Sequence, residues 1–173
     1  MESSNYWSHF YATSRNLGPS AFAEWVDALG LSFGAVVDLG CGDGRDTIFW
    51  AAQERCSGRV LGIDQSATAI ERGKARADAS GTGEAQFLTL DIGEADWSSS
   101  AREMLWRSES TLFYMRFLLH AIPAWAQDTL LKGVRALCSK AITSRWSSGP
   151  RTIRLYRRLS LNIFVVIKQV RLW

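Results

Sequence analysis

Cysteine and histidine are scarce in this chain of 173 residues, which contains three cysteines and two histidines. The cysteines are Cys41, Cys56 and Cys138; none belongs to a C-x-x-C pair, and no histidine pair lies near them. A disulfide framework needs an even set of cysteines, and a zinc site needs closely spaced ligands. The sequence therefore predicts neither a disulfide scaffold nor a bound metal, and all three cysteines have a structural interpretation.

Long hydrophobic runs are missing as well. The longest late run, NIFVVI at residues 162–167, is far shorter than the roughly 20 residues of a transmembrane helix. The first residues, MESSNYWSHFYATSRN, lack the basic start and apolar stretch of a secretion signal. The content of 47% hydrophobic and 21% charged residues is typical of one globular domain. We expect a cytoplasmic protein without a membrane span.

Acidic residues are absent from the last part of the chain. From Cys138 to Trp173 there are eight Lys or Arg and no Asp or Glu, whereas residues 1–137 hold 12 basic and 17 acidic residues. We interpret 1–137 as the core of the domain and 138–173 as a basic, atypical C-terminal segment of that domain. In this segment only NIFVVIKQV, residues 162–170, predicts a strand.

Helical and strand patterns alternate along the core. Ser20 and Ser66 are residue types that cap helices, and we expect Arg72, Lys74 and Arg76 to face solvent mostly. Strands separated by helices predict a parallel sheet, so the expected fold is α/β, a Rossmann-like doubly wound sheet flanked by helices. The predicted helices are SAFAEWVDAL (20–29), GRDTIFWAAQE (44–54), QSATAIERGKARADA (65–79) and PAWAQDTLLKGVRAL (123–137), and the predicted strands are GAVVDLG (34–40), RVLGID (59–64), AQFLTLD (85–91) and TLFYMRFLL (111–119).

A glycine-rich loop, DLGCGDG, follows the first predicted strand. Gly40 and Gly42 allow a positive φ and a close backbone approach to a ligand, and Gly44 allows the next helix to approach the sheet. The dinucleotide pattern G-x-G-x-x-G fails because position 45 is arginine, and no phosphate-binding Gly-Lys-Ser/Thr follows. Asp38 would repel a pyrophosphate but accept hydrogen bonds from an amine. The loop therefore indicates a nucleoside ligand without phosphates.

Two more acids occupy equivalent positions after the next two strands. Asp64 ends the second strand, where a carboxylate can accept both hydroxyls of a ribose, and Asp91 ends the third, where it can accept from an adenine amine. Ile92 would pack on the ring. A single Asp there is usually a turn former or a cap, but three around such a loop favour one binding site.

The segments VVDLGCGDGRDT, VLGIDQS and FLTLD, in this order, strongly resemble class I S-adenosylmethionine-dependent methyltransferases, especially the small-molecule branch. The resemblance covers roughly residues 5–137 and implies S-adenosylmethionine as cofactor. In that family the loop passes under the methionine part, and the two later acids bind ribose and adenine. The implied cofactor-binding residues are Asp38, Gly40, Cys41, Gly42, Gly44, Asp64, Gln65, Asp91 and Ile92.

The acceptor site is expected after the fourth strand, in YMRFLLHAIPAWAQ. His120 suits a general base because its pKa lies near neutrality, although it can equally cap the helix that follows. Tyr114 is a candidate cofactor contact; it and Arg116 either line the site or pack the strand. In the N-terminal cluster YWSHFYATSR, Tyr11 is the candidate cofactor contact if the cluster forms a lid, but a helix pinned to the core also explains it.

These observations predict methyl transfer to a small-molecule acceptor on oxygen, nitrogen or sulfur. The tetrapeptide N/D-P-P-Y/F, which family members use to methylate amino groups of bases or glutamine, is absent. Methylation of a nucleic acid bound by the basic segment is therefore disfavoured. A catalytically silent nucleoside-binding module is the alternative. It is favoured by residues 138–173, which are too few for the family's full set of terminal strands and suggest a truncated domain with an exposed sheet edge.

Overall fold

The computed structural model describes residues 18–82, 84–104, 111–119, 121–143, 152–158 and 163–169. Its centre is a six-stranded sheet with the strand order β3-β2-β1-β4-β6-β5. The first four strands in the chain are mutually parallel, and the order 3-2-1-4 is that of a doubly wound sheet. The predicted α/β fold is thus confirmed. These strands are β1 (Phe33–Leu39), β2 (Cys56–Asp64), β3 (Ala85–Thr89) and β4 (Thr111–Met115).

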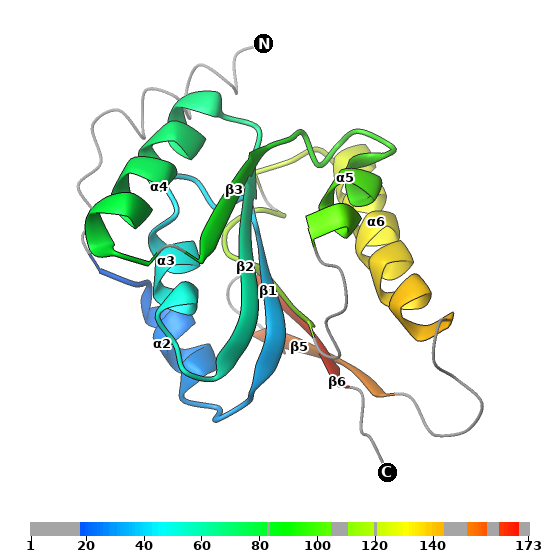
Figure 1. Cartoon of the computed structure of the whole chain (residues 1–173). Helices are drawn as coiled ribbons and strands as arrows, with labels where there is room; N and C mark the ends of the chain where they lie inside the picture. The colour runs from blue at the N-terminus through cyan, green and yellow to red at the C-terminus, as the bar shows by residue number, and fades with distance from the viewer. Residues whose placement is uncertain are drawn as a thin grey trace.

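Helices cover both faces of the sheet, as Figure 1 shows. One face carries α2 (Ala21–Asp27), α3 (Arg45–Ala51) and α4 (Ala67–Ser80); the other carries α5 (Trp97–Met104) and α6 (Ala124–Thr143). None of the helices that the structure describes has both the length and the apolar character that a membrane crossing requires.

Two apolar layers separate the helices from the sheet. Val36, Val60 and Leu112 of the strands pack with Phe22 and Trp50 of the helices on the face of α2 and α3. On the other face the strands contribute Val37, Leu61 and Phe113, which pack with Trp97 and Leu130. Consecutive strand residues point to opposite faces, so a strand buried on both sides reads as a continuous apolar run. The run GAVVDLG is therefore explained by its central place in the sheet.

The helix starts follow the sequence pattern, with one helix missed. Ser20 and Ser66 have extended backbones, and their side chains accept from the amides of Ala23 and Ala69, so both predicted caps are confirmed. Helix α5 was not predicted, because its first turns are rich in serine. It is anchored by Trp97, which is fully buried against Gly133 of α6, where a Cβ atom would overlap the indole ring.

The C-terminal segment forms two strands, β5 (Thr152–Arg158) and β6 (Ile163–Gln169). They pair with each other in antiparallel register, and β6 also pairs antiparallel with β4. The prediction of a single strand in this segment was therefore wrong. The truncated-domain interpretation implies an exposed sheet edge, but the free side of β4 is paired with β6 over Thr111, Leu112 and Phe113. Helix α6 continues across the change in composition at Cys138.

Replacing Ser20 with alanine is expected to lower the free energy of unfolding by about 1 to 2 kcal/mol, at the upper end for a lost helix cap. Its hydroxyl caps α2 and also donates to Asp46 Oδ2 at 2.7 Å. Ser66→Ala is the matched control, since the Ser66 hydroxyl caps α4 with the Ala69 amide at 3.3 Å. Urea denaturation of both variants measures the difference. Equal losses would show that the Asp46 contact adds nothing to the cap.

Candidate functional site

The glycine loop lies where the central strands end. Gly40, Gly42 and Gly44 have φ angles of 72°, 57° and 76°, a region that disfavours any side chain. The amides of Gly40 and Cys41 donate to the carbonyl of Ile63 at 2.8 and 3.0 Å, which ties the loop to the end of β2. The loop thus turns back over the carboxyl edge of the sheet, the edge at which ligands bind in this architecture.

Gly44 allows a close approach between layers, as its position predicts. A Cβ atom at Gly44 would overlap the ring of Phe87 on β3 and lie 3.3 Å from Gly73 Cα on α4. A Cβ atom at Gly73 would meet the same ring at 2.7 Å. The Phe87 side chain therefore fills a space that exists only because both residues are glycines.

Asp64 holds the loop in place. Its Oδ2 accepts from the amide of Gly42 and its Oδ1 from the amide of Ser66, both at 2.9 Å. Burial is the largest influence on this carboxyl and raises its pKa, while the two backbone hydrogen bonds oppose the shift. A carboxylate has about four lone-pair sites, so two remain after these amides are bound. Asp64 can therefore bind two hydroxyls while it anchors the loop.

Asp38 is a buried acid with one unused oxygen. Its exposed fraction is 3%, and Thr47 Oγ1 donates to its Oδ2 at 2.7 Å. Burial, assisted by the negative charge of Asp46, raises its pKa to about 8. Within the part of the chain that the structure describes, no group donates to Asp38 Oδ1. A cationic ligand at this oxygen would favour the ionised carboxylate.

The loop after β3 places Asp91 at the same edge. Asp91 is exposed, and its Oδ1 accepts from the Gly93 amide at 2.8 Å, which closes a tight turn around the buried Ile92. A Cβ atom at Gly93 would lie 3.1 Å from the indole of Trp125, which is 64% exposed. Trp125 therefore lies against the turn that sequence reasoning assigned to adenine, a contact that no pattern around it predicts.

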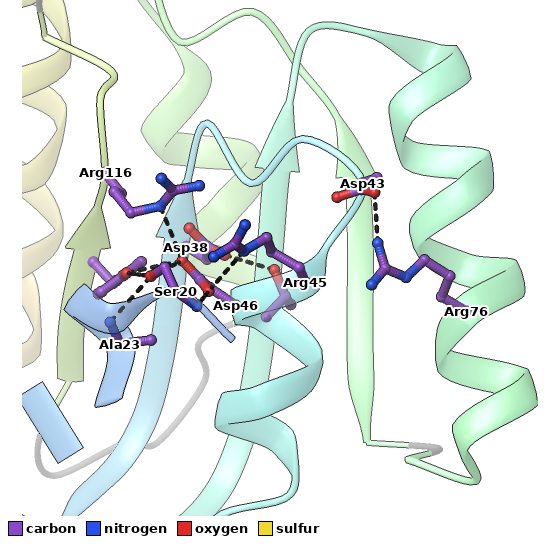
Figure 2. A network of polar contacts seen from close by, with 10 residues as sticks. Ser20, Ala23, Asp38, Asp43, Arg45, Asp46, Arg76 and Arg116 are labelled. Atoms are coloured by element: carbon purple, nitrogen blue, oxygen red, sulfur yellow. Dashed lines mark hydrogen bonds and ion pairs between the residues drawn. The ribbon is translucent and has the colours of Figure 1, made fainter. Parts of the chain in front are cut away.

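Asp46 is the centre of a buried polar cluster that the sequence analysis missed (Figure 2). Its exposed fraction is 4%, and it accepts from the amide and hydroxyl of Ser20, each at 2.7 Å. The Tyr114 hydroxyl donates to Oδ2 at 2.9 Å, and Arg116 Nε donates to the same atom at 3.2 Å. Arg45 Nε lies 3.5 Å from Oδ1. Asp46 therefore links α2, α3 and the end of β4.

The Tyr114 hydroxyl is hydrogen-bonded within this cluster. The side chain is 1% exposed, and its ring packs against Phe22 and Trp50 at centroid distances of 5.3 and 5.7 Å. Burial, followed by the charges of Asp46 and Asp38, raises the Tyr114 pKa far above its ordinary value, so the group stays a donor. A direct cofactor contact by Tyr114 remains a prediction.

Arg76 also differs from the sequence expectation. Its side chain is 30% exposed and pairs with Asp43 Oδ2 at 2.5 Å, so its prediction as solvent-facing was wrong. Asp43 belongs to the glycine loop and is itself buried. The pair attaches the loop to α4 (Figure 2). It also gives the buried Asp43 carboxylate a partner, without which its desolvation would be costly.

The remaining predicted residues lie in different surroundings or outside the described residues. Cys41 is buried, and burial, assisted by the charges of Asp38 and Asp64, raises the pKa of its thiol well above the ordinary value. Gln65 is exposed, directly after Asp64. Tyr11 and His120 lie outside the described residues. Among the residues with described positions, no group of three or more His, Cys, Asp or Glu side chains is arranged to hold a metal ion.

Residues 32–123, more than half of the chain, match a family model described as a methyltransferase domain. The match begins just before β1 and ends just before α6, so it contains all three acids and the glycine loop. No curated protein matches the chain in sequence.

The chain is similar to many solved structures, among them the following three. A structure described as the conversion of a disulfide bond into a thioacetal group during echinomycin biosynthesis is 19% identical, with a TM-score of 0.44 and coverage of 87% of this chain and 81% of that one. A putative rRNA methylase from Clostridium thermocellum is 14% identical (TM-score 0.47, coverage 90% and 100%). Magnesium protoporphyrin IX methyltransferase from Synechocystis PCC 6803, with bound S-adenosylmethionine, is 16% identical (TM-score 0.40, coverage 87% and 77%).

Proposed function

Because the chain belongs to the family of S-adenosylmethionine-dependent methyltransferase domains, we propose that it transfers the methyl group to a small-molecule acceptor at the carboxyl edge of β1 to β4. One observation carries the proposal. The loop with three left-handed glycines is held by Asp64 and lies beside Asp38, a buried acid whose Oδ1 accepts from no group among the described residues.

The residues at this edge fit the cofactor group by group. Asp38 Oδ1 suits the α-ammonium of the methionine part, because a charge-assisted hydrogen bond would compensate the burial of the carboxylate. Asp64 has lone pairs left for the ribose hydroxyls, and Asp91 lies at the neighbouring strand end for the adenine amine. Ile92, buried beneath the turn, would pack against the adenine ring.

S-adenosylmethionine, when bound, supplies a methyl group already activated by the sulfonium, and transfer breaks the carbon–sulfur bond while its electron pair stays on sulfur. This chain must therefore hold the acceptor atom in line with that bond and exclude water, since positioning supplies most of the acceleration. His120 is the proposed general base for an acceptor proton, on sequence grounds alone.

A small molecule is the acceptor class that the strand end favours. The four residues that follow β4 are Arg116, Phe117, Leu118 and Leu119, in place of the N/D-P-P-Y/F tetrapeptide that holds a planar amino group. Incubation of the purified chain with labelled cofactor and a metabolite extract tests this proposal. Label in RNA or DNA and none in small molecules would contradict it, and cofactor binding without any transfer would identify a silent module.

Asp64→Ala is expected to weaken binding of S-adenosylhomocysteine, the demethylated product, by roughly 10- to 150-fold. The reason is the loss of hydrogen bonds to a charged group, typically about 1.5 to 3 kcal/mol. Isothermal titration calorimetry measures the change. Asp78→Ala is the matched control because Asp78 is an exposed acid on α4, the helix that follows Asp64. If Asp64→Ala binds the product as tightly as the parent chain, the ribose assignment is wrong.

A further inference from the structure

Arg116 is held rigidly at the point where the acceptor would meet the cofactor. Met115 pairs with Leu39 in the parallel register of β4 and β1, so the next residue of each strand, Arg116 and Gly40, continues from neighbouring strand ends. Arg116 Nε donates to Asp46 Oδ2 at 3.2 Å, and Figure 2 shows its side chain extending from the end of β4 toward Asp46. A buried carboxylate therefore fixes the orientation of this guanidinium.

Among the described residues, no acceptor binds the terminal nitrogens of Arg116. The side chain is 26% exposed, and Asp46 is its one carboxylate partner among the side chains that the structure describes. That contact uses Nε, which leaves both terminal amino groups of the planar fork to donate. A guanidinium held by one edge can bind a carboxylate in two-point geometry with little further loss of side-chain freedom.

The charge around Asp46 favours an anion. Its single negative charge is shared by two guanidinium groups, with Arg45 at 3.5 Å and Arg116 at 3.2 Å. Neighbouring Asp38 does not change this balance, because its carboxylate charge in the cofactor complex would be compensated by the ammonium group proposed to bind it. The positive charge of the two arginines therefore exceeds the negative charge at Asp46.

Phe117 presents an aromatic face beside this guanidinium. Its φ angle is 59°, the one positive φ of a residue other than glycine in the described chain, and its side chain is 39% exposed. The Arg116 guanidinium carbon lies 4.8 Å from the ring centroid. A left-handed conformation costs a bulky residue roughly 1 to 2 kcal/mol, and such conformations cluster at ligand sites. The ring is held at the strand end at an energetic cost, and part of its surface is exposed.

We propose that Arg116 and Phe117 bind the methyl acceptor, and that the acceptor is a planar or aromatic molecule with a carboxylate. The carboxylate would lie on the terminal nitrogens of Arg116 and the planar part against the Phe117 ring. This inference rests on the proposed function, since it places the acceptor beside the cofactor loop. The carboxylate of the cofactor's own methionine part has the same chemistry, so the experiment must distinguish these two sources.

The test uses a panel of hydroxy- and aminobenzoates, each paired with the corresponding benzamide, which differs in charge but hardly in shape. Binding is measured by calorimetry to the full chain saturated with S-adenosylhomocysteine. At least one acid is expected to bind ten-fold or more tightly than its amide, the effect of one charged hydrogen bond. Arg116→Gln should remove this preference, and Arg55→Gln, at an exposed arginine paired with Asp27, should keep it.

The Phe117 variants separate binding from folding. Phe117→Leu should weaken binding of acid and amide alike, because the flat ring is lost. Phe117→Gly should do the same while raising the melting temperature or leaving it unchanged, since glycine adopts the positive φ freely. A clear fall in the melting temperature of Phe117→Gly would show that the ring packs the core, and it would overturn the role of Phe117 as a binding surface.

Three outcomes would overturn the inference about Arg116. In the first, the parent chain binds none of the acids more tightly than the corresponding amide. In the second, Arg116→Gln keeps the preference of the parent chain for the acid. In the third, Arg116→Gln weakens binding of S-adenosylmethionine at least ten-fold but not that of its decarboxylated analogue, which would assign the carboxylate to the cofactor. Failure of the parent chain to bind S-adenosylhomocysteine at all would instead contradict the proposed function, and it would appear before any acceptor is added.

Discussion

Gly44→Ala is expected to destabilise the domain by about 3 kcal/mol or more. Two costs add at this position. A left-handed φ of 76° costs a non-glycine residue roughly 1 to 2 kcal/mol, and overpacking of a filled core typically costs about 1 to 3 kcal/mol. The new methyl group would overlap the Phe87 ring, which is confined between β3 and α4 by Gly73. Chemical denaturation monitored by tryptophan fluorescence measures the loss.

Gly81→Ala is the matched control for this prediction. Gly81 caps α4 with a φ of 69°, but a Cβ atom there would have no neighbour within 4 Å. Its loss of stability should therefore reflect backbone strain alone, at about 1 kcal/mol. In the background of Phe87→Leu, which removes part of the ring, the cost of Gly44→Ala should approach that of Gly81→Ala. Equal losses for Gly44→Ala and Gly81→Ala in the parent chain would contradict the packing role of Gly44.

Asp38→Asn is expected to stabilise the protein at neutral pH by on the order of 3 kcal/mol and to abolish tight cofactor binding. The Asp38 pKa of about 8, against an ordinary 3.8, means that burial disfavours the charged form in the folded state. Asparagine has nearly the same shape, and its carbonyl oxygen can accept the Thr47 hydroxyl in place of Oδ2. It carries no charge, so it cannot hold an ammonium group as the carboxylate does.

The stabilisation by Asp38→Asn should depend on pH with a defined sign. An acid whose folded pKa is raised binds more protons in the folded state than in the unfolded state, so its contribution to stability falls as pH rises. The fall begins near the ordinary pKa of 3.8 and ends near 8. The difference in stability between the variant and the parent chain should therefore widen between about pH 4 and pH 8 and stay level above pH 8.

Thermal unfolding of both proteins across this range checks the pH dependence, and calorimetry with S-adenosylmethionine checks the binding. Affinity of the parent chain for the cationic cofactor should rise with pH up to about 8, because the carboxylate must lose its proton to bind the ammonium. Asp38→Asn should show no such rise. A stability difference that does not change with pH would mean that Asp38 has an ordinary pKa.

Much of the local structure at the carboxyl edge of the sheet was predictable because its pattern is local. Glycines that need a left-handed backbone, serines that cap helices and an apolar run that ends in an acid all lie within a few residues of the feature that they specify. Parallel strands bring their carboxyl ends to one edge, so Asp38, Asp64 and Asp91 were expected together before any contact was known. Their individual roles toward the cofactor remain predictions.

The C-terminal strand β5 could not be predicted from local sequence patterns. β5, with the sequence TIRLYRR, contains three arginines in seven residues, a composition with little resemblance to a core strand. It forms a strand because β6 supplies hydrogen-bonding partners along its whole length. Strand preference depends on cross-strand neighbours, and charged residues are tolerated at an edge.

Only the tertiary structure decided the surroundings of Asp46. Its partners Ser20, Tyr114 and Arg116 lie 26, 68 and 70 residues away in the chain, so no window of sequence contains the cluster. The sequence by itself determined a glycine loop with a left-handed backbone at the end of a central strand, because backbone geometry there depends on neighbouring residues. The orientation of Arg116 depends on which distant carboxylate is buried beside it, and long-range packing alone determines that.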